Sequence, residues 1–378
     1  MKLFIRNNTL FFLFIASQIV VAILGVQNDK IIGEFRSFKS ALFLHFLGLI
    51  LFTVGYLPLS KSTFLPLKIE KKQITINSAF YKISYVVTVV GVVTSIVTIG
   101  TFIPPKEYLE ILFTGGKGLG DLRAEAYSSG LSGFFKMMNY FPLGIFLISN
   151  AYSVFYKMHG SELKKINNLS LFSLLASIVK VFFVMDRLTI LAIILVYFYK
   201  FILDGKIKAK FLIYMFLVIP ILSFVTSSRM NGSGVFDFLV TYFKLSLANF
   251  ELVIDNQENY SYGFNSFLMP FIFILRFFGV KYEVIEPENW IWNPAQYFAS
   301  YLYIDFGFFS VLFFFLIGWL VRIIQVKTLK GNLKFVAVYF IVLFGITTFI
   351  SVPIIRAVEF WLLISLGLFL SKFVKIVE

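Results

Sequence analysis

Cysteine is absent from the chain, and histidine occurs at only two of its 378 positions, His45 and His159. Without cysteine there is no disulfide, no thiol nucleophile and no thiolate-bound metal. Two histidines are too few for a histidine-rich metal centre. Acidic residues form no D-x-D pair, and Glu286-Pro-Glu288 is typical of a solvated loop. We therefore expect neither a metal nor another cofactor.

Charged residues are also scarce, at 14% of the chain, whereas a soluble domain averages roughly 25%. Hydrophobic residues make up 59%, and the mean hydropathy is +0.86. Apolar runs of about 16–21 residues are near the length that crosses a bilayer. The sequence therefore predicts a single all-α integral membrane domain over residues 1–378, with spans at about 9–26, 41–59, 83–103, 138–156, 169–185, 188–203, 211–226, 308–325, 335–351 and 360–375.

The basic residues are distributed unevenly over the two sides that these ten spans define. One side, which includes both termini, carries 20 Lys and Arg against 4 Asp and Glu, and the other carries 13 against 16. Basic loops stay in the cytoplasm. Both termini are therefore expected to be cytoplasmic, and the net charge of +14 reports topology. It does not indicate nucleic-acid binding.

The longest interval without a predicted span is 227–307, on the outer side. It is too aromatic and apolar for a disordered linker, so we expect a folded cap over a site at the membrane surface. Residues 266–280 form an apolar run broken by Pro270 and Arg276, which favours an interfacial or re-entrant helix. Within 235–254, Asp237, Lys244 and Glu251 recur every seven residues, as in an amphipathic helix lying on a membrane.

Lys180 is predicted to lie more than one turn inside a span, where a cation costs up to roughly 2.5–3.5 kcal/mol on insertion scales. If the helix continues to Arg187, seven residues on, the two cations share one face. They would then form a basic stripe at the outer leaflet. The alternative is that Lys180 only extends its ammonium to the surface and Arg187 is an ordinary flanking charge.

Five of the arginines predicted on the outer side are candidates for the site: Arg123, Arg187, Arg229, Arg276 and Arg356. Each could be a simple anchor among lipid phosphates. If several converge on one cavity, their guanidinium groups suit bidentate phosphate binding. The start of the last span, next to Arg356, would add the positive end of a helix dipole.

Several acidic and aromatic residues on the same side are candidates for the remaining chemistry. Glu359, Asp305, Asp186 and Glu251 are possible general bases, and Glu359 is the most attractive because it follows Arg356 by one turn. An ion pair between those two is the alternative. Trp290 and Trp292 suit either an interfacial aromatic belt or a platform for sugar rings. Asn293 and Gln296 would then bind the sugar hydroxyls.

Four short motifs resemble the Wzy-type polymerases that join the oligosaccharide repeat units of O-antigen and capsule. They are Asp186-Arg-Leu-Thr, Tyr262-Gly-Phe-Asn-Ser-Phe, Asn293-Pro-Ala-Gln followed by Tyr303-Ile-Asp-Phe-Gly-Phe-Phe-Ser, and Gly318-Trp-Leu-Val-Arg. The resemblance covers about residues 180–325. It leaves open whether Asp186 tempers the charge of Arg187 or acts as a base.

The resemblance implies glycosyl transfer on the outer face of the bacterial cytoplasmic membrane. The substrates would be oligosaccharides on undecaprenyl pyrophosphate, serving as both donor and acceptor, and a chain-length regulator is a further expected partner. Arg187, Arg229 and Arg356 would converge on the pyrophosphate, extended inward by Lys180. An O-antigen ligase uses the same donor and stays an alternative, as does a flippase for lipid-linked sugars. A flippase, however, should show polar residues through the membrane midplane and repeat symmetry between its halves. The sequence shows neither feature.

Overall fold

The computed structural model describes residues 7–25, 39–57, 71–100, 103–104, 106–108, 110, 137–184, 186–204, 235–272, 279, 298–348 and 356–377. The chain divides into two compact units. Unit 1 comprises Met1–Lys68, Leu239–Leu329 and Gly345–Trp361. Unit 2 comprises Ile69–Phe238, Lys330–Phe344 and Leu362–Glu378.

The described chain is almost entirely helical, as predicted, and its one small sheet has two strands. The helices are α2 (Thr9–Gly25), α3 (Lys39–Tyr56), α4 (Ser78–Gly100), α8 (Phe141–Phe155), α9 (Gly160–Val184), α10 (Arg187–Asp204), α12 (Val235–Asn256), α14 (Phe298–Phe306), α15 (Val311–Leu329), α16 (Leu333–Thr348) and α17 (Val358–Leu370). Short π or 3-10 turns are η3 (Phe264–Leu268), η4 (Met269–Phe271), η5 (Gly307–Ser310) and η7 (Ser371–Phe373). The strands are β1 (Gln73–Ile76) and β2 (Val374–Val377).

Helices occupy nine of the ten predicted spans, and the tenth, 211–226, lies outside the described residues. Among the described residues, four helices are long and apolar enough to cross a membrane: Lys39–Tyr56, Ser78–Gly100, Gly160–Val184 and the continuous Ala299–Leu329. The apolar parts of α2, α8, α10 and α16 are shorter. The protein is therefore a helical chain with several membrane-span candidates. The span predicted at 308–325 begins earlier than expected, because α14 and η5 lead into α15 without a break.

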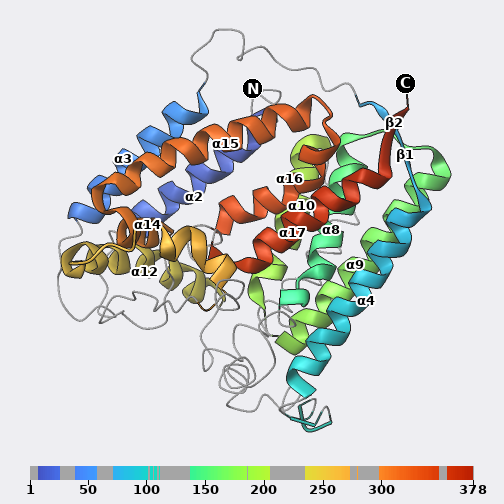
Figure 1. The fold of residues 1–378 in the computed structure, drawn as a ribbon, viewed down its shortest axis with the longest axis horizontal. Helices are drawn as coiled ribbons and strands as arrows, with labels where there is room; N and C mark the ends of the chain where they lie inside the picture. The colour runs from blue at the N-terminus through green and yellow to red at the C-terminus, as the bar shows by residue number, and fades with distance from the viewer. Residues whose placement is uncertain are drawn as a thin grey trace. The chain divides into compact units, whose positions relative to one another are not determined.

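In unit 1, α3 and α15 pack closely along their length, with α2 against them (Figure 1). Glycines make this approach possible. A Cβ added at Gly55 would lie 2.1 Å from the carbonyl oxygen of Phe315, and one at Gly318 would lie 2.2 Å from that of Phe52. Small residues at helix crossings let backbones meet directly, as is common between membrane helices. The Phe14 and Phe52 rings, 4.0 Å apart, join α2 to the pair.

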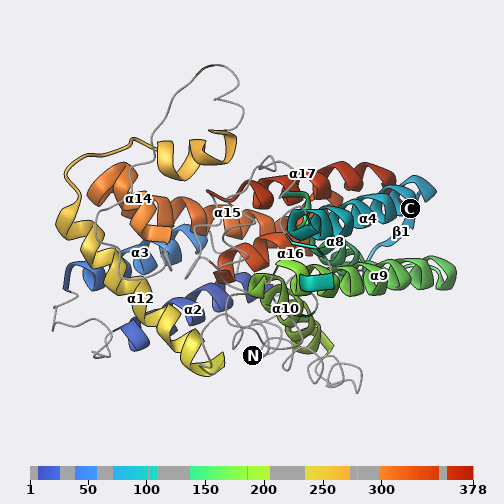
Figure 2. The ribbon, with the colours of Figure 1, turned by 90° about the horizontal axis from the view of Figure 1, so that it is seen from below.

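In unit 2, α4, α8 and α9 pack side by side (Figure 2). Gly91 receives the Pro142 ring, since a Cβ there would be 2.3 Å from the proline Cδ. The hydroxyls of Thr88, Thr94, Ser95 and Thr98 on α4 find acceptors within the helix, whereas the buried Ser84 hydroxyl has no hydrogen-bond partner among the described residues. Thr88 and Ser95, for example, donate to carbonyls one turn back. This helix therefore carries few unsatisfied hydrogen-bond donors among its apolar neighbours.

One end of unit 2 gathers four connections that are distant in sequence. β1 pairs antiparallel with β2, from Gln73 opposite Val377 to Ile76 opposite Val374. Lys157, after α8, exchanges backbone hydrogen bonds with Lys72 and Ile74. The Tyr156 hydroxyl donates to the Gly331 carbonyl, 2.8 Å away, in the turn before α16. All four connections belong to the side that the charge count predicts to be cytoplasmic.

The predictions for the long outer segment are partly tested. The helix expected at 235–254 is present as α12, but Glu251 is not on a solvated face. It is 5% exposed and accepts hydrogen bonds from the backbone N–H groups of Ser40 and Ala41 at the start of α3. A carboxylate at a helix N-terminus satisfies unpaired N–H groups and meets the positive dipole end. The exposed face predicted from the seven-residue spacing is therefore wrong at Glu251, because tertiary packing covers it.

We predict that Gly318→Ala destabilises unit 1, because the added methyl group meets the Phe52 carbonyl and helix backbones cannot yield. Overpacking of this kind costs about 1–3 kcal/mol. Thermal unfolding in detergent, followed by tryptophan fluorescence, should show a lower midpoint. Gly160→Ala is the matched control, because nothing lies within 4 Å of a Cβ there. Equal midpoints for the two variants would contradict the close-approach argument.

Candidate functional site

A buried ion pair lies between α9 and α10 in unit 2. Lys180 is fully buried and pairs with Asp186, which is 4% exposed. The Lys180 ammonium also donates to the Thr189 hydroxyl at 2.8 Å and lies 3.4 Å from the centre of the Tyr140 ring. Thr189 in turn donates to Asp186 at 2.7 Å. The cation is therefore surrounded by a carboxylate, a hydroxyl and an aromatic face.

The local sequence explains why Asp186 is in this place. α9 ends at Val184 and α10 begins at Arg187. Asp186 occupies the position before α10, and its Oδ1 accepts the Leu188 N–H at 3.0 Å. Asp is a favoured residue at a helix N-cap for this reason. The motif Asp186-Arg-Leu-Thr is thus a helix start whose cap also neutralises a buried lysine.

This arrangement corrects one expectation. Lys180 and Arg187 do not share a face of one helix, because the helix ends between them. The basic stripe predicted from their spacing is therefore wrong. The charge of Lys180 is balanced by Asp186, and the Arg187 side chain lies outside the described part of the structure. An Asp between two apolar runs, at a position that suits an N-cap, was the sequence signal for this break.

Tyr108 supports the same end of α9. Its hydroxyl donates to the carbonyl oxygens of Phe182 at 2.6 Å and Phe183 at 3.1 Å, in the last turn of the helix. Burial raises the pKa of Tyr108 well above its usual range, so the hydroxyl stays protonated and remains a donor. The final carbonyls of a helix lack hydrogen-bond donors within the helix, and the Tyr108 hydroxyl is the donor for two of them.

A second buried carboxylate, Asp305, organises unit 1. It is fully buried and accepts three hydrogen bonds: from the Ser261 hydroxyl, from the Asn265 N–H at 3.0 Å and from the Ser266 N–H at 2.7 Å. The backbone adds two more links between the segments, since Ser261 N–H donates to Ile304 and Tyr262 N–H donates to Asp305. Asp305 thus holds the start of η3 against the end of α14. Three donors occupy its oxygens.

Two glycines make the same contact possible. Gly263 has φ +91°, and a Cβ there would be 3.1 Å from the Phe306 ring. Gly307 has φ +56°, and a Cβ there would be 2.8 Å from the Tyr260 ring. Glycine tolerates a positive φ without steric cost. Gly263 of the Tyr262 motif therefore packs against Phe306 of the Tyr303 motif, and Gly307 of the Tyr303 motif packs against Tyr260, just before the first motif.

Arg356 lies beside the same helix. Its guanidinium carbon is 3.6 Å from the centre of the Tyr301 ring, one turn before Asp305 on α14. Its Nε is buried and has no hydrogen-bond partner among the described residues. A cation over an aromatic face is attracted by the ring's quadrupole. Two of the predicted site residues, Asp305 and Arg356, are thus placed along one helix of unit 1.

Glu359 follows in the first turn of α17, where its charge faces the positive end of the helix dipole. Two buried residues that the sequence did not single out, Tyr301 and Ser300, also belong to this part of unit 1. The Tyr301 ring packs against Arg356, and the hydroxyls of Ser300 and of Ser266, the serine of the Tyr262 motif, have no hydrogen-bond partner among the described residues. Neither Tyr301 nor Ser300 has a distinctive local pattern, so only the packing identifies them.

The remaining predicted residues are not placed. Arg123, Arg229, Arg276, Trp290, Trp292, Asn293 and Gln296 lie outside the described residues. The convergence of Arg187, Arg229 and Arg356 on one anion therefore stays a prediction. Within the described ranges, no three His, Asp or Glu side chains are grouped as a metal site would require. Comparison of the chain with known protein families, curated proteins and solved structures finds no match in any of the three.

We predict that Lys180 and Asp186 are energetically coupled. Lys180→Met leaves a buried carboxylate, and Asp186→Asn leaves a buried ammonium, each costing about 3–5 kcal/mol. The double variant removes both charges and keeps a side-chain oxygen for the Leu188 N–H. Its unfolding midpoint should therefore exceed that of either single variant. A double variant whose loss equals the sum of the two single losses would show that the pair is not coupled.

We predict that Asp305→Asn loosens the 261–266 segment, because an amide cannot accept from all three donors. Hydrogen exchange, measured by mass spectrometry on peptides over 260–268, should be faster in the variant. Glu258→Gln is the matched control, since it removes an exposed carboxylate from the same connection. Unchanged exchange in Asp305→Asn would mean that the backbone hydrogen bonds alone hold the segment.

Proposed function

We propose that this protein is a membrane glycosyltransferase that polymerises oligosaccharide repeat units carried on undecaprenyl pyrophosphate. It acts at the outer face of the bacterial cytoplasmic membrane, in the synthesis of O-antigen or capsule. The observation that carries the proposal is the interlocking of two of the four resembling motifs. Asp305 joins Tyr262-Gly-Phe-Asn-Ser-Phe to Tyr303-Ile-Asp-Phe-Gly. Arg356 packs against Tyr301, which lies one turn before Asp305 on α14. Residues that resemble a family's motifs thus meet at Asp305, and a cationic side chain packs against the same helix one turn away.

The reaction requires a cation near a phosphate. An acceptor sugar hydroxyl attacks the anomeric carbon of the donor glycan, and a new C–O bond forms. The bond from that carbon to the pyrophosphate oxygen breaks, and undecaprenyl pyrophosphate leaves with the electron pair. A base removes the hydroxyl proton. A site built from arginines accelerates this step chiefly by stabilising the negative charge of the departing pyrophosphate.

Arg356 and Glu359 suit these two tasks. Arg356 is partly buried, so its interaction with a phosphate would be less screened than at an open surface. It also stands just before α17, where the helix dipole favours an anion. Glu359 in the first turn of that helix is our candidate for the base. Asp305, with its oxygens already occupied, is assigned to holding the scaffold.

The sheet end of unit 2 supports the ten-span topology. The connections at Lys72, Lys157, Gly331 and Phe373 are hydrogen-bonded together, so an even number of crossings lies between each successive pair. The proposed count between Lys157 and Gly331 is four. A full crossing at 266–280 would make it five and separate those connections. The lysines clustered at this end indicate the cytoplasmic side, which leaves Asp186 and Arg356 for the outer side.

Deleting the gene in its host and separating the surface polysaccharide on a gel tests the proposal. If the protein is the polymerase, the glycan of the deletion strain should stop at one repeat unit, and the wild-type gene should restore long chains. Loss of all glycan from the lipid A core would instead indicate the ligase. An unchanged ladder would exclude both enzymes.

We further predict that Arg356→Lys fails to restore normal chain extension in the deletion strain. Lysine keeps the charge over Tyr301 but loses the forked donors, so a bidentate phosphate contact is lost. The rate of extension should fall roughly tenfold or more, the size expected for a hydrogen bond to a charged group. Lys106→Ala is the control, because it removes an exposed cation from a predicted outer loop. Full activity of Arg356→Lys at equal membrane level would remove Arg356 from the site.

A further inference from the structure

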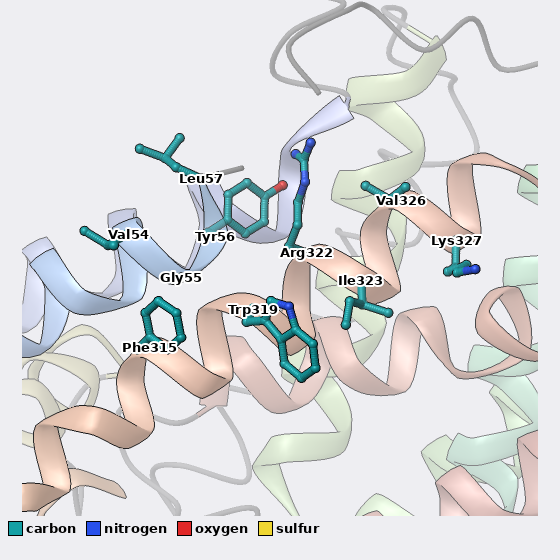
Figure 3. A pocket seen from close by; sticks show the side chains of 10 residues that line it. All are labelled: Val54, Gly55, Tyr56, Leu57, Phe315, Trp319, Arg322, Ile323, Val326 and Lys327. Carbon is teal, nitrogen blue, oxygen red and sulfur yellow. The ribbon is translucent and has the colours of Figure 1, made fainter. Parts of the chain in front are cut away.

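Unit 1 contains a groove of about 360 Å³ between the end of α3 and residues 315–327 of α15 (Figure 3). Its floor on α15 consists of Phe315, Trp319, Ile323 and Val326, whose spacing of three and four residues places them on one face of the helix. Gly55 forms part of the α3 side and contributes no side chain to fill the space. The volume is in the range of roughly 300–1,000 Å³ typical of ligand pockets.

The apolar part of the groove is open. Trp319 is 51% exposed, Phe315 37%, Val54 47% and Leu57 41%. These residues lie at the end of α3 and on the Ala299–Leu329 helix, both of which are long and apolar enough to span a membrane. Large apolar side chains exposed on such helices face hydrocarbon chains, and a concave stretch of them accommodates a chain better than a flat one.

The other part of the groove is basic. Arg322 is held in place by Tyr56, whose ring centre is 5.3 Å from the guanidinium carbon, and by Asn8, whose Oδ1 accepts from the guanidinium at 3.4 Å. Figure 3 shows the Tyr56 hydroxyl directed toward Arg322. Lys327 lines the groove further along α15 and is exposed. None of the ten lining residues, all of them described, carries a carboxylate.

The groove therefore changes from apolar to cationic along one helix. From Phe315 to Lys327 the axis of α15 rises about 18 Å, close to the roughly 15 Å depth of one leaflet's hydrocarbon. A molecule that fits this pattern has an acyl chain at one end and an anion at the other. Arginine binds phosphate oxygens in a fork, and lysine adds a point charge.

We propose that this groove is a binding site for one anionic phospholipid, with its acyl chain against Phe315 and Trp319 and its phosphate at Arg322 and Lys327. Arg322 and Lys327 belong to the side that carries the basic excess, so the lipid is one of the inner leaflet. The site is therefore separate from the proposed glycosyl transfer at the outer face. Its test does not depend on that activity.

Trp319 provides a direct probe. The full chain with Trp290, Trp292 and Trp361 changed to Phe keeps Trp319 as its single tryptophan. Reconstituted in phosphatidylcholine vesicles, it is exposed to brominated phosphatidylglycerol or to brominated phosphatidylcholine at equal mole fraction. Quenching of Trp319 should be stronger with the anionic lipid. The relative binding constant should be higher on the order of fivefold for each basic contact.

The variant Arg322→Gln with Lys327→Gln should lose this preference. The matched control is Lys330→Gln with Lys334→Gln, which removes two exposed cations of the same side that do not line the groove. Equal quenching by the two lipids would overturn the proposal, as would a preference that survives in the groove variant or disappears in the control. Millimolar inorganic phosphate that abolishes the preference would also overturn it, because the site would then bind an anion without a lipid chain.

A second measurement tests the proposal even if the single-tryptophan protein does not fold. Phospholipid that co-purifies with the unmodified chain is quantified by mass spectrometry and compared with the same two double variants. Enrichment of anionic lipid in the unmodified chain and the control, with loss in the groove variant, supports the site. Equal lipid composition in all three proteins contradicts it.

Discussion

Each charged side chain that these helices bury has to be compensated inside the protein, because a hydrocarbon environment offers no counter-charge. Lys180 has Asp186, Thr189 and the Tyr140 ring. Asp305 has three donors, and Glu251 has the first N–H groups of α3. In a chain with so few charges, these contacts determine where helices begin and which segments meet. The fold and the candidate site are therefore built from the same ionisable residues.

Two kinds of contact hold the helices together, and they serve different ends. Glycines at 55 and 318 let α3 and α15 approach at backbone distance, which stabilises unit 1 without polar groups. Asp305 instead ties an irregular segment to α14, the helix that holds Arg356 through Tyr301. A rigid support of this kind is what a phosphate-binding arginine requires if its geometry is to survive substrate binding. The proposed polymerase would use Arg356 as such a fixed cation.

The proposed lipid groove and the proposed reaction site use the same chemistry, and the charge count predicts that they lie at opposite faces of the membrane. Both combine an arginine with a tyrosine ring, Arg322 with Tyr56 and Arg356 with Tyr301. The aromatic face holds the guanidinium in place while leaving N–H donors for phosphate oxygens. The proposed polymerase would have to distinguish its lipid-linked substrates from the surrounding phospholipids. The predicted charge difference between the two membrane faces would allow it to distinguish them by location.

Composition and hydropathy by themselves determined the helical membrane class and the positions of nine helices, because a span needs about 20 apolar residues wherever it occurs. They also indicated Asp186, Asp305 and Arg356 as unusual, since a charge near an apolar run is conspicuous. Only the tertiary structure decided what those residues contact. The spacing of Lys180 and Arg187 predicted one face, yet a cap at Asp186 ends the helix first. The partners of Asp305 are some 40 residues away and those of Glu251 more than 200, and no local pattern records which distant backbone groups a carboxylate will meet.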